Sequence, residues 1–317
     1  MKDAARTILA RHLERGSRVR LGLSGGLDSI VLLSVLSQLR DDYPLSALHV
    51  HHGLSAQADE WARFCEQTCA QLDVPIETVR VMLPTRMPEG VEAAARAARY
   101  AALIRPGADA VITAHHADDQ AETVLFQLLR GGGPRALAAM PEIRELSPNL
   151  PLLRPLLAFT RAELESYARL HGLLWVEDES NADSRYSRNA LRHELLPALA
   201  RFIPDYRERL IGSAQRMAEA AQLLDALAAL DGAAAGLPDS ITNTSLAALS
   251  EARARNLLAY YLRLHGTPLP SPAHLAEMLR QLKEARTRLV LPLPDGRVLV
   301  RLKGRIQIDR FKNAGQQ

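Results

Sequence analysis

The chain has 317 residues and a formal net charge of +3 at pH 7, with 47% hydrophobic and 24% charged residues. This balance is ordinary for a globular protein that buries a real core, and the length suffices for two domains. No apolar run approaches the roughly 18 residues of a membrane span, and the charged start of the chain is unlike a signal peptide, so we expect a cytoplasmic protein without membrane contact.

The first predicted strand, 19–23, runs into the hexapeptide SGGLDS at 24–29, and a predicted helix over 28–40 follows. Two consecutive glycines let the backbone approach a ligand closely, and the amides of the helical turn favour an anion such as a nucleotide phosphate. The spacing differs from that of a Walker A loop, which also needs a lysine. Asp28 instead occupies the first helical turn, where a carboxylate can hold Mg²⁺ beside phosphates. The alternative is a purely structural turn with Ser and Asp caps.

Strand and helix signals then alternate. This pattern predicts an α/β fold with a parallel sheet covered by helices on both faces. Ligands bind such sheets beyond the carboxyl ends of the strands, and polar clusters follow three of them: SGGLDS, the histidines 49–52, and 113–119. We expect these clusters to converge on one edge. The further strands are predicted over 45–50, 76–81 and 109–114, and the further helices over 56–72, 91–104 and 118–130.

Two helices place charged pairs on one face. Asp119 and Glu122 are three residues apart, a spacing that suits a carboxylate pair for binding magnesium or orienting an amine. The alternative is an acidic first turn favoured by the helix dipole. Arg96 and Arg99 have the same spacing and would neutralise a triphosphate, unless they are simply solvated. The histidine clusters also admit a zinc site and thus a metal-dependent hydrolase, although strand-end histidines beside a nucleotide need no metal.

The second half predicts a helical linker followed by a small α+β module. Gly236 and Pro238 mark the boundary between them. We therefore expect three parts: a nucleotide-binding domain over 1–204, a helical linker over 205–237 and a module over 238–317. The predicted elements are a short buried segment at 152–157, helices at 161–171, 205–230, 251–265 and 272–282, and strands at 288–292, 297–302 and 305–309.

The basic residues and the cysteines restrict the kinds of partner and reaction that we expect for this chain. Nine Lys or Arg residues occur from Lys283 to Lys312, which suits a polyanionic partner such as RNA; a merely solvated face is the alternative. Lys2 is the only lysine before Lys283, so a ligase that forms a covalent lysyl-nucleotide is disfavoured. The two cysteines, Cys65 and Cys69, form no C-x-x-C motif and provide neither a disulfide framework nor a cluster site.

Seven segments taken together resemble the bacterial tRNA(Ile)-lysidine synthetases, a family of the PP-loop ATP pyrophosphatase superfamily. The resemblance covers about residues 19–200, and 240–312 resemble the first C-terminal domain of that family more loosely. Longer members continue into a second C-terminal domain, so this chain is similar to the short form. Gly132 stands where a serine often occurs. The segments are SGGLDS, HVHHGL, EAAARAARYAAL, TAHHADDQAETVL, RGGG, LLRPLL and WVEDESNADSRYSRNALRHELLP.

The resemblance implies a ligase that uses ATP and Mg²⁺. Such enzymes adenylate the cytidine at the first anticodon position of a tRNA(Ile) bearing CAU, releasing pyrophosphate, and free L-lysine then displaces AMP. Asp28 would bind the magnesium, and the catalytic residues would be Asp28, His116, Asp119 and Glu122, with the base left open among the last three. Asp119, Glu122 and Arg188 would bind substrate. The nucleotide would be contacted by Ser24, Gly25, Gly26, Leu27, Asp28, Ser29, His49, Arg96 and Arg99.

Other interpretations stay open on the residues alone. A sulfur transferase of the same superfamily would need reactive cysteines, and an amidotransferase-type synthetase would need a glutaminase module that the sequence does not show. A non-catalytic nucleotide-gated RNA-binding protein would keep the glycine turn but have no use for Asp119 and Glu122. The alanine-rich helices leave the oligomeric state open, a homodimer included.

Overall fold

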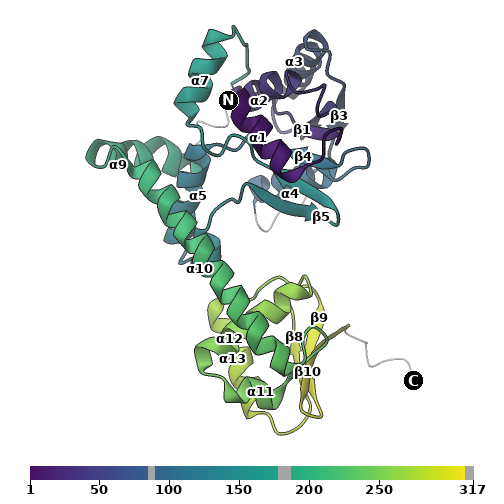
Figure 1. Cartoon of the computed structure of the whole chain (residues 1–317), viewed down its shortest axis with the longest axis vertical. Helices are drawn as coiled ribbons and strands as arrows, with labels where there is room; N and C mark the ends of the chain where they lie inside the picture. Colours follow the sequence, from purple (N-terminus) through teal and green to yellow (C-terminus); the bar gives the residue numbers. More distant parts are fainter. Residues whose placement is uncertain (85–89, 178–186, 311–317) are drawn as a thin grey trace. The chain divides into compact units, whose positions relative to one another are not determined.

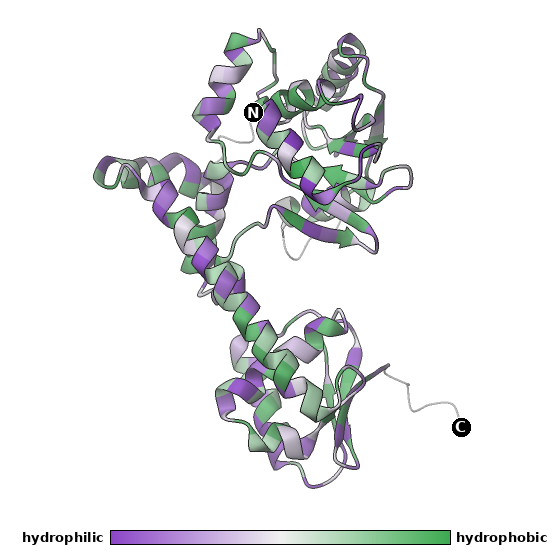
Figure 2. Cartoon of the chain, viewed as in Figure 1, coloured by the Kyte–Doolittle hydropathy of each residue, from purple (hydrophilic) through white to green (hydrophobic). Residues whose placement is uncertain are grey.

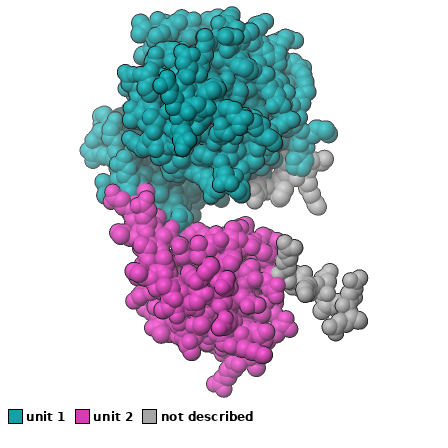
Figure 3. All heavy atoms as spheres, turned by 45° about the vertical axis from the view of Figure 1, so that its right-hand side comes forward, with its two compact units in different colours: residues 1–216 teal, residues 217–317 magenta. Residues whose placement is uncertain are grey.

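The computed structural model describes residues 1–84, 90–177 and 187–310. The chain forms two compact units, residues 1–216 and 217–317 (Figure 3), and helix α10 (Tyr206–Ala235) contains the division. The three-part boundaries expected from the sequence stay a prediction. Among the described helices, none combines the length and the hydropathy that crossing a bilayer requires.

Unit 1 is built on a six-stranded sheet in the order β3-β2-β1-β4-β6-β5. The first five strands of that order are parallel, and only β5 runs antiparallel to its neighbour. The predicted α/β class with a parallel sheet is therefore confirmed. The strands are β1 (Val19–Gly22), β2 (Leu45–His51), β3 (Ile76–Arg80), β4 (Ala110–Ile112), β5 (Ile143–Ser147) and β6 (Leu150–Leu153).

Helices follow the parallel strands and return the chain along the sheet (Figure 1), which brings several helix N-termini to the carboxyl edge of the strands. A short π-helical turn, η2, interrupts the helical stretch before α10. The helices of unit 1 before α10 are α1 (Lys2–His12), α2 (Leu27–Ser37), α3 (Ala58–Gln71), α4 (Val91–Leu103), α5 (Ala117–Leu129), α6 (Pro134–Leu137), α7 (Arg161–Leu170), α8 (Ser187–Ala190), η2 (Leu191–Leu195) and α9 (Leu196–Phe202).

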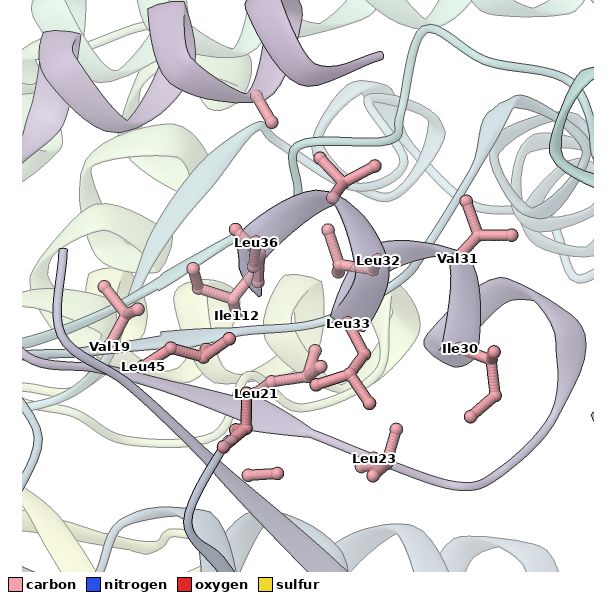
Figure 4. Close-up of a cluster of buried hydrophobic side chains, with 14 of the residues drawn as sticks. Val19, Leu21, Leu23, Ile30, Val31, Leu32, Leu33, Leu36, Leu45 and Ile112 are labelled. Carbon is pink, nitrogen blue, oxygen red and sulfur yellow. The ribbon is translucent and has the colours of Figure 1, made fainter. Parts of the chain in front are cut away.

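The core of unit 1 centres on α2, because this helix is apolar on every side and must be covered on every side (Figures 2 and 4). Val31, Leu32 and Leu33 are fully buried and pack in one cluster with the β1 residue Leu21. A second cluster, which includes Leu103 of α4, covers the other side chains of the sheet. The two clusters separate the sheet into an α2 face and an α4 face.

Unit 2 is an α+β module with its own core, as the sequence predicts. Its four strands pair in the order β7-β10-β9-β8, all antiparallel, and the fully buried Tyr261 lies in its apolar cluster. Its elements after α10 are β7 (Ile241–Thr242), α11 (Asn243–Ala248), α12 (Glu251–Leu264), α13 (Pro272–Glu284), β8 (Leu289–Pro292), β9 (Arg297–Leu302) and β10 (Arg305–Arg310).

Candidate functional site

The carboxyl ends of β1, β2 and β4 lie at one edge of the sheet because the three strands are parallel neighbours. This edge carries the three polar clusters that the sequence places after those strands. The glycine turn follows β1, the histidines 49–52 end and follow β2, and 113–119 lead from β4 into α5. The expected convergence is therefore present.

The glycine turn is closely backed by neighbouring segments. Gly25 has φ of +87°, and a Cβ there would lie 3.0 Å from Val176 Cγ2 and 3.1 Å from Cys65 Sγ. The amide of Val176 also donates to the Gly25 carbonyl at 3.0 Å. Position 25 thus requires glycine for both its conformation and its space. Leu27 is buried and anchors the start of α2.

Ser29 organises the backbone of the turn from within. Its Oγ accepts the amides of Ser24 and Gly25 at 3.3 and 3.2 Å and donates to the Gly26 carbonyl at 3.0 Å. The Ser24 hydroxyl lies 3.1 Å from Ser29 Oγ. Since no described side chain caps the N-terminus of α2, the turn offers amides and hydroxyls in the arrangement that suits an oxyanion.

His116 joins the acidic residues of the edge. Its side chain is buried, with Nε2 at 3.6 Å from Asp28 Oδ2 and 3.5 Å from Asp119 Oδ2, and Nδ1 at 3.7 Å from Asp118 Oδ2. Burial lowers the pKa of His116, but these carboxylates outweigh it and raise the pKa above its usual value. Burial likewise raises the pKa of Asp28, but His116 and the nearby arginines bring it below its usual value. The imidazolium of His116 and the carboxylate of Asp28 stabilise each other's charged forms.

Two arginines that the sequence analysis missed complete this cluster. Arg161, the first residue of α7, approaches Asp28 Oδ2 at 3.3 Å. Arg192 Nη2, on η2, lies 2.8 Å from Glu122 Oε2 and 3.1 Å from Asp119 Oδ1. Neither arginine has a local sequence signal for this role.

Asp118 and Asp119 have different roles despite being adjacent. Asp118 accepts the amide of Arg161 at 2.8 Å and pairs with Arg207 of α10, so it ties the first turn of α5 to two other helices. Asp119 turns toward Glu122 and its shared partner Arg192. The i,i+3 pair therefore converges.

The remaining sequence candidates lie beside the cluster or outside the described side chains. His49 is buried below the turn, and its Nδ1 is 2.9 Å from the Leu23 carbonyl oxygen. Arg96 donates to the Tyr100 hydroxyl at 3.1 Å on the α4 face of the sheet. Arg99 is exposed. The pKa of His52 is lowered to about 4, first by the burial of His52 and then by the positive charge of Arg99. The side chain of Arg188 and residues 178–186 lie outside the described part of the chain.

The donor set at the edge fits magnesium better than zinc. Among the residues that the structure describes, no three His, Cys, Asp or Glu side chains are arranged to hold a metal ion. Zinc sites take three or four protein ligands, whereas magnesium in nucleotide sites takes one or two carboxylates together with phosphates and waters. Asp28 is partly exposed and contacts Arg161 only at 3.3 Å or more, so it fits the second mode.

The cysteines lack the properties of reactive thiols. Cys65 and Cys69 are fully buried, and burial raises their pKa values to about 12 and about 11. A thiol attacks as the thiolate, which these pKa values disfavour at neutral pH. Cys65 instead packs under Gly25, and its Sγ lies 3.6 Å from His49 Nδ1. This environment argues against sulfur transfer.

A parallel sheet with this glycine turn at the end of its first strand defines an ATP-binding domain of the PP-loop type. The chain belongs to the PP-loop domain family, whose model matches residues 2–199. A second model, described as a TilS substrate binding domain, matches residues 244–307, and the curated relatives below are named tRNA(Ile)-lysidine synthase. The resemblance stated from the sequence motifs is thus confirmed.

Three curated relatives named tRNA(Ile)-lysidine synthase illustrate the match. The protein of Chromobacterium violaceum is 49% identical over 84% of this chain and 62% of its own length. That of Nitrosomonas europaea is 45% identical over 86% and 61%, and that of an Azoarcus species 46% identical over 92% and 65%. The chain therefore spans about three fifths of the length of these relatives.

A solved structure shows the same fold. The U34-tRNA thiolase NcsA from Methanococcus maripaludis, solved with its [4Fe-4S] cluster, superimposes with a TM-score of 0.59 at 18% identity. The match covers 69% of this chain and 78% of that one. At this identity the likeness concerns the fold alone.

Proposed function

We propose that the chain ligates free L-lysine to C2 of the cytidine at the first anticodon position of a CAU-bearing tRNA(Ile), with ATP as the second substrate. One observation carries this proposal: the glycine turn and an acidic cluster meet at one sheet edge, joined through His116 between Asp28 and Asp119. An anion site and a cation site side by side suit a reaction that releases pyrophosphate and consumes an amine.

In the first half-reaction, the cytidine O2 attacks the α-phosphorus of ATP, and the bond to the bridging oxygen of the β-phosphate breaks. Pyrophosphate leaves with concentrated negative charge. The amides of the glycine turn and the hydroxyls of Ser24 and Ser29 would hold the pyrophosphate. Asp28 would hold Mg²⁺, which neutralises phosphate charge when bound. Arg96 and Arg99 would contact the nucleotide from α4.

In the second half-reaction, the side-chain amine of lysine attacks C2, and AMP leaves with the oxygen. Free lysine has a side-chain pKa of about 10.4, so its ammonium must lose a proton first. Asp119 and Glu122 would bind the ammonium and accept that proton, with His116 alongside. Their contacts with Arg192 hold both carboxylates in place, and a carboxylate has lone pairs enough for a second partner.

Mass spectrometry of the tRNA tests the proposal directly. Incubation with ATP, Mg²⁺, lysine and CAU-bearing tRNA(Ile) should add lysine, with loss of water, to one cytidine and yield AMP and pyrophosphate. A tRNA(Met) with the same anticodon and reactions without lysine serve as controls. The absence of any lysine adduct under saturating ATP would contradict the proposal.

A single substitution separates an enzyme from a nucleotide-gated RNA binder. Asp28→Ala should abolish formation of the adduct while RNA binding persists, because the proposed metal contact serves the chemical step. Retention of full turnover by Asp28→Ala would contradict the role given to this carboxylate.

A further inference from the structure

The α4 face of the sheet edge carries a group of cations distinct from the acidic cluster. Arg96, Arg144 and Arg154 surround Tyr100, and we call this group the α4 cation cluster. Arg96 and Tyr100 come from α4, Arg144 from β5, and Arg154 directly follows β6. The guanidinium carbons of Arg96 and Arg144 lie 5.1 and 4.9 Å from the centre of the Tyr100 ring.

Strand alternation explains why these residues share a face. Leu152 of β6 and Val111 of β4 pack with Tyr100 in the cluster on the α4 side. Paired residues of neighbouring antiparallel strands share a face, so Arg144 of β5, the partner of Leu152, lies on this face, and Arg154 comes two residues after Leu152. Burial lowers the pKa of His115 to about 3, and the charges of Arg154 and other arginines add to this lowering.

Among the residues that the structure describes, the cluster contains positive charge without a countercharge. In the described part of the chain none of the three arginines pairs with a carboxylate; their side-chain partners are the Tyr100 phenol and backbone carbonyls. A neutral phenol between three guanidinium groups does not balance them. The pKa of Tyr100 is below its usual value, because the arginines outweigh its burial.

Arg154 carries the strongest sign that the cluster has a ligand. It is 2% exposed, and its Nη1 donates to the Pro141 carbonyl at 2.6 Å, but its buried Nε has no hydrogen-bond partner among the described residues. Burial lowers the pKa of this guanidinium to about 10. Burying a cation without an anion or a full set of acceptors is costly, so such an arrangement is expected where an anion binds.

We propose that the α4 cation cluster binds a phosphate group, at a site separate from the glycine turn. The planar guanidinium of the half-buried Arg144 can bind two phosphate oxygens at once, with Arg96 beside it and Arg154 supplying charge from below. The phosphate belongs either to the RNA backbone or to the triphosphate of ATP. The RNA source rests on the proposed function, whereas the phosphate chemistry does not.

Arg144→Gln tests the site, with Arg40→Gln as the matched control. Arg40 is exposed near the end of α2, and its Nη1 donates to the Leu72 carbonyl at 2.8 Å, away from the carboxyl edge of the sheet. Two probes are measured without lysine, so that no turnover is required. These are a fluorescent anticodon stem-loop RNA at several salt concentrations and, separately, a non-hydrolysable ATP analogue.

The two probes distinguish the source of the phosphate. If the RNA supplies it, Arg144→Gln weakens RNA binding roughly five- to tenfold and lowers the slope of log K against log salt by about 0.7–0.9, which loss of a merely structural arginine would not do. If ATP supplies it, the analogue loses affinity by a similar factor and the RNA slope is unchanged. Arg40→Gln should change neither affinity.

The proposal is overturned if Arg144→Gln binds both probes as the parent protein does. Arg144→Lys provides a second measurement, because it keeps the charge but loses the planar fork and should recover only part of the affinity. Circular dichroism confirms that each variant is folded. Because the readout is binding alone, the two proposals can fail separately. If Arg144→Gln weakens binding as expected but the parent protein forms no lysidine, the result contradicts the proposed function and not this site.

Discussion

Gly25 is the residue at which conformation and packing most tightly constrain the sequence. Its positive φ costs any other residue strain, and a Cβ would lie closer to Val176 and Cys65 than such contacts usually are, so these side chains would have to shift. We expect Gly25→Ala to lower the free energy of unfolding by about 2–4 kcal/mol and to abolish nucleotide binding.

Gly16→Ala separates the two causes. Gly16 has a similar φ of +92°, but a methyl group at this position would have no other atom within 4 Å, so its substitution should cost only the strain of about 1 kcal/mol. Urea denaturation of both variants measures the difference. Equal losses at the two positions would show that the contacts behind Gly25 are unimportant.

His115 makes the free energy of unfolding depend on pH. Its pKa is lowered to about 3 by burial and by neighbouring arginines, whereas in the unfolded chain it returns to about 6.5. The unfolded chain therefore takes up a proton first, and the folded state loses stability as pH falls below about 6.5, by up to about 1.4 kcal/mol per pH unit.

The variant His115→Asn should lose this dependence. Asparagine can keep a contact with Thr113, whose hydroxyl lies 2.9 Å from His115 Nδ1, but it does not titrate. The free energy of unfolding, measured in urea between pH 7 and pH 5, should fall less steeply for the variant. Parallel curves for the variant and the parent protein would contradict the assigned pKa direction.

At the level of the elements, Asp118 connects three helices. From the first turn of α5 it accepts the Arg161 amide at the start of α7 and pairs with Arg207 of α10. We expect Asp118→Asn to lower the free energy of unfolding by about 1–2 kcal/mol, since the amide keeps one hydrogen bond but loses the charge. Asp3→Asn, at an exposed pair with Arg6, is the control and should change it by less than about 0.5 kcal/mol in urea denaturation. Equal effects of the two substitutions would contradict the connecting role of Asp118.

The sequence predicts the local parts of this architecture and misses those set by distant contacts. The strand, glycine turn and helix around Asp28 follow one another along the chain, so periodicity and turn chemistry identify them. Arg161 and Arg192 reach the site only through the packing of α7 and η2, which no local pattern encodes. Strand β5 is absent from the sequence-based prediction because Ile143–Ser147 is a partly exposed edge with charged residues among its apolar ones.

At the scale of the whole molecule, the chain contains separate apolar cores in its two units. Leu33 belongs to the α2 cluster of unit 1 and Leu262 to the cluster of unit 2, and both are fully buried. Truncating either to alanine should cost about 2–5 kcal/mol in its own unit. Calorimetry should therefore resolve two transitions, with Leu33→Ala shifting one and Leu262→Ala the other. A single transition that both variants shift equally would show that the units unfold together.

The hydroxyl of Ser29 influences which ligands the glycine turn can bind. It accepts two amides at 3.2 and 3.3 Å, which are long contacts to a neutral oxygen. A ligand can replace the Ser29 hydroxyl only if it offers those amides a better acceptor, and only an oxygen carrying substantial negative charge does so. The displaced Ser29 hydroxyl can then rotate and donate a hydrogen bond to the bound anion. Water and neutral metabolites gain little by the exchange, so the turn by itself already discriminates by charge before any metal arrives.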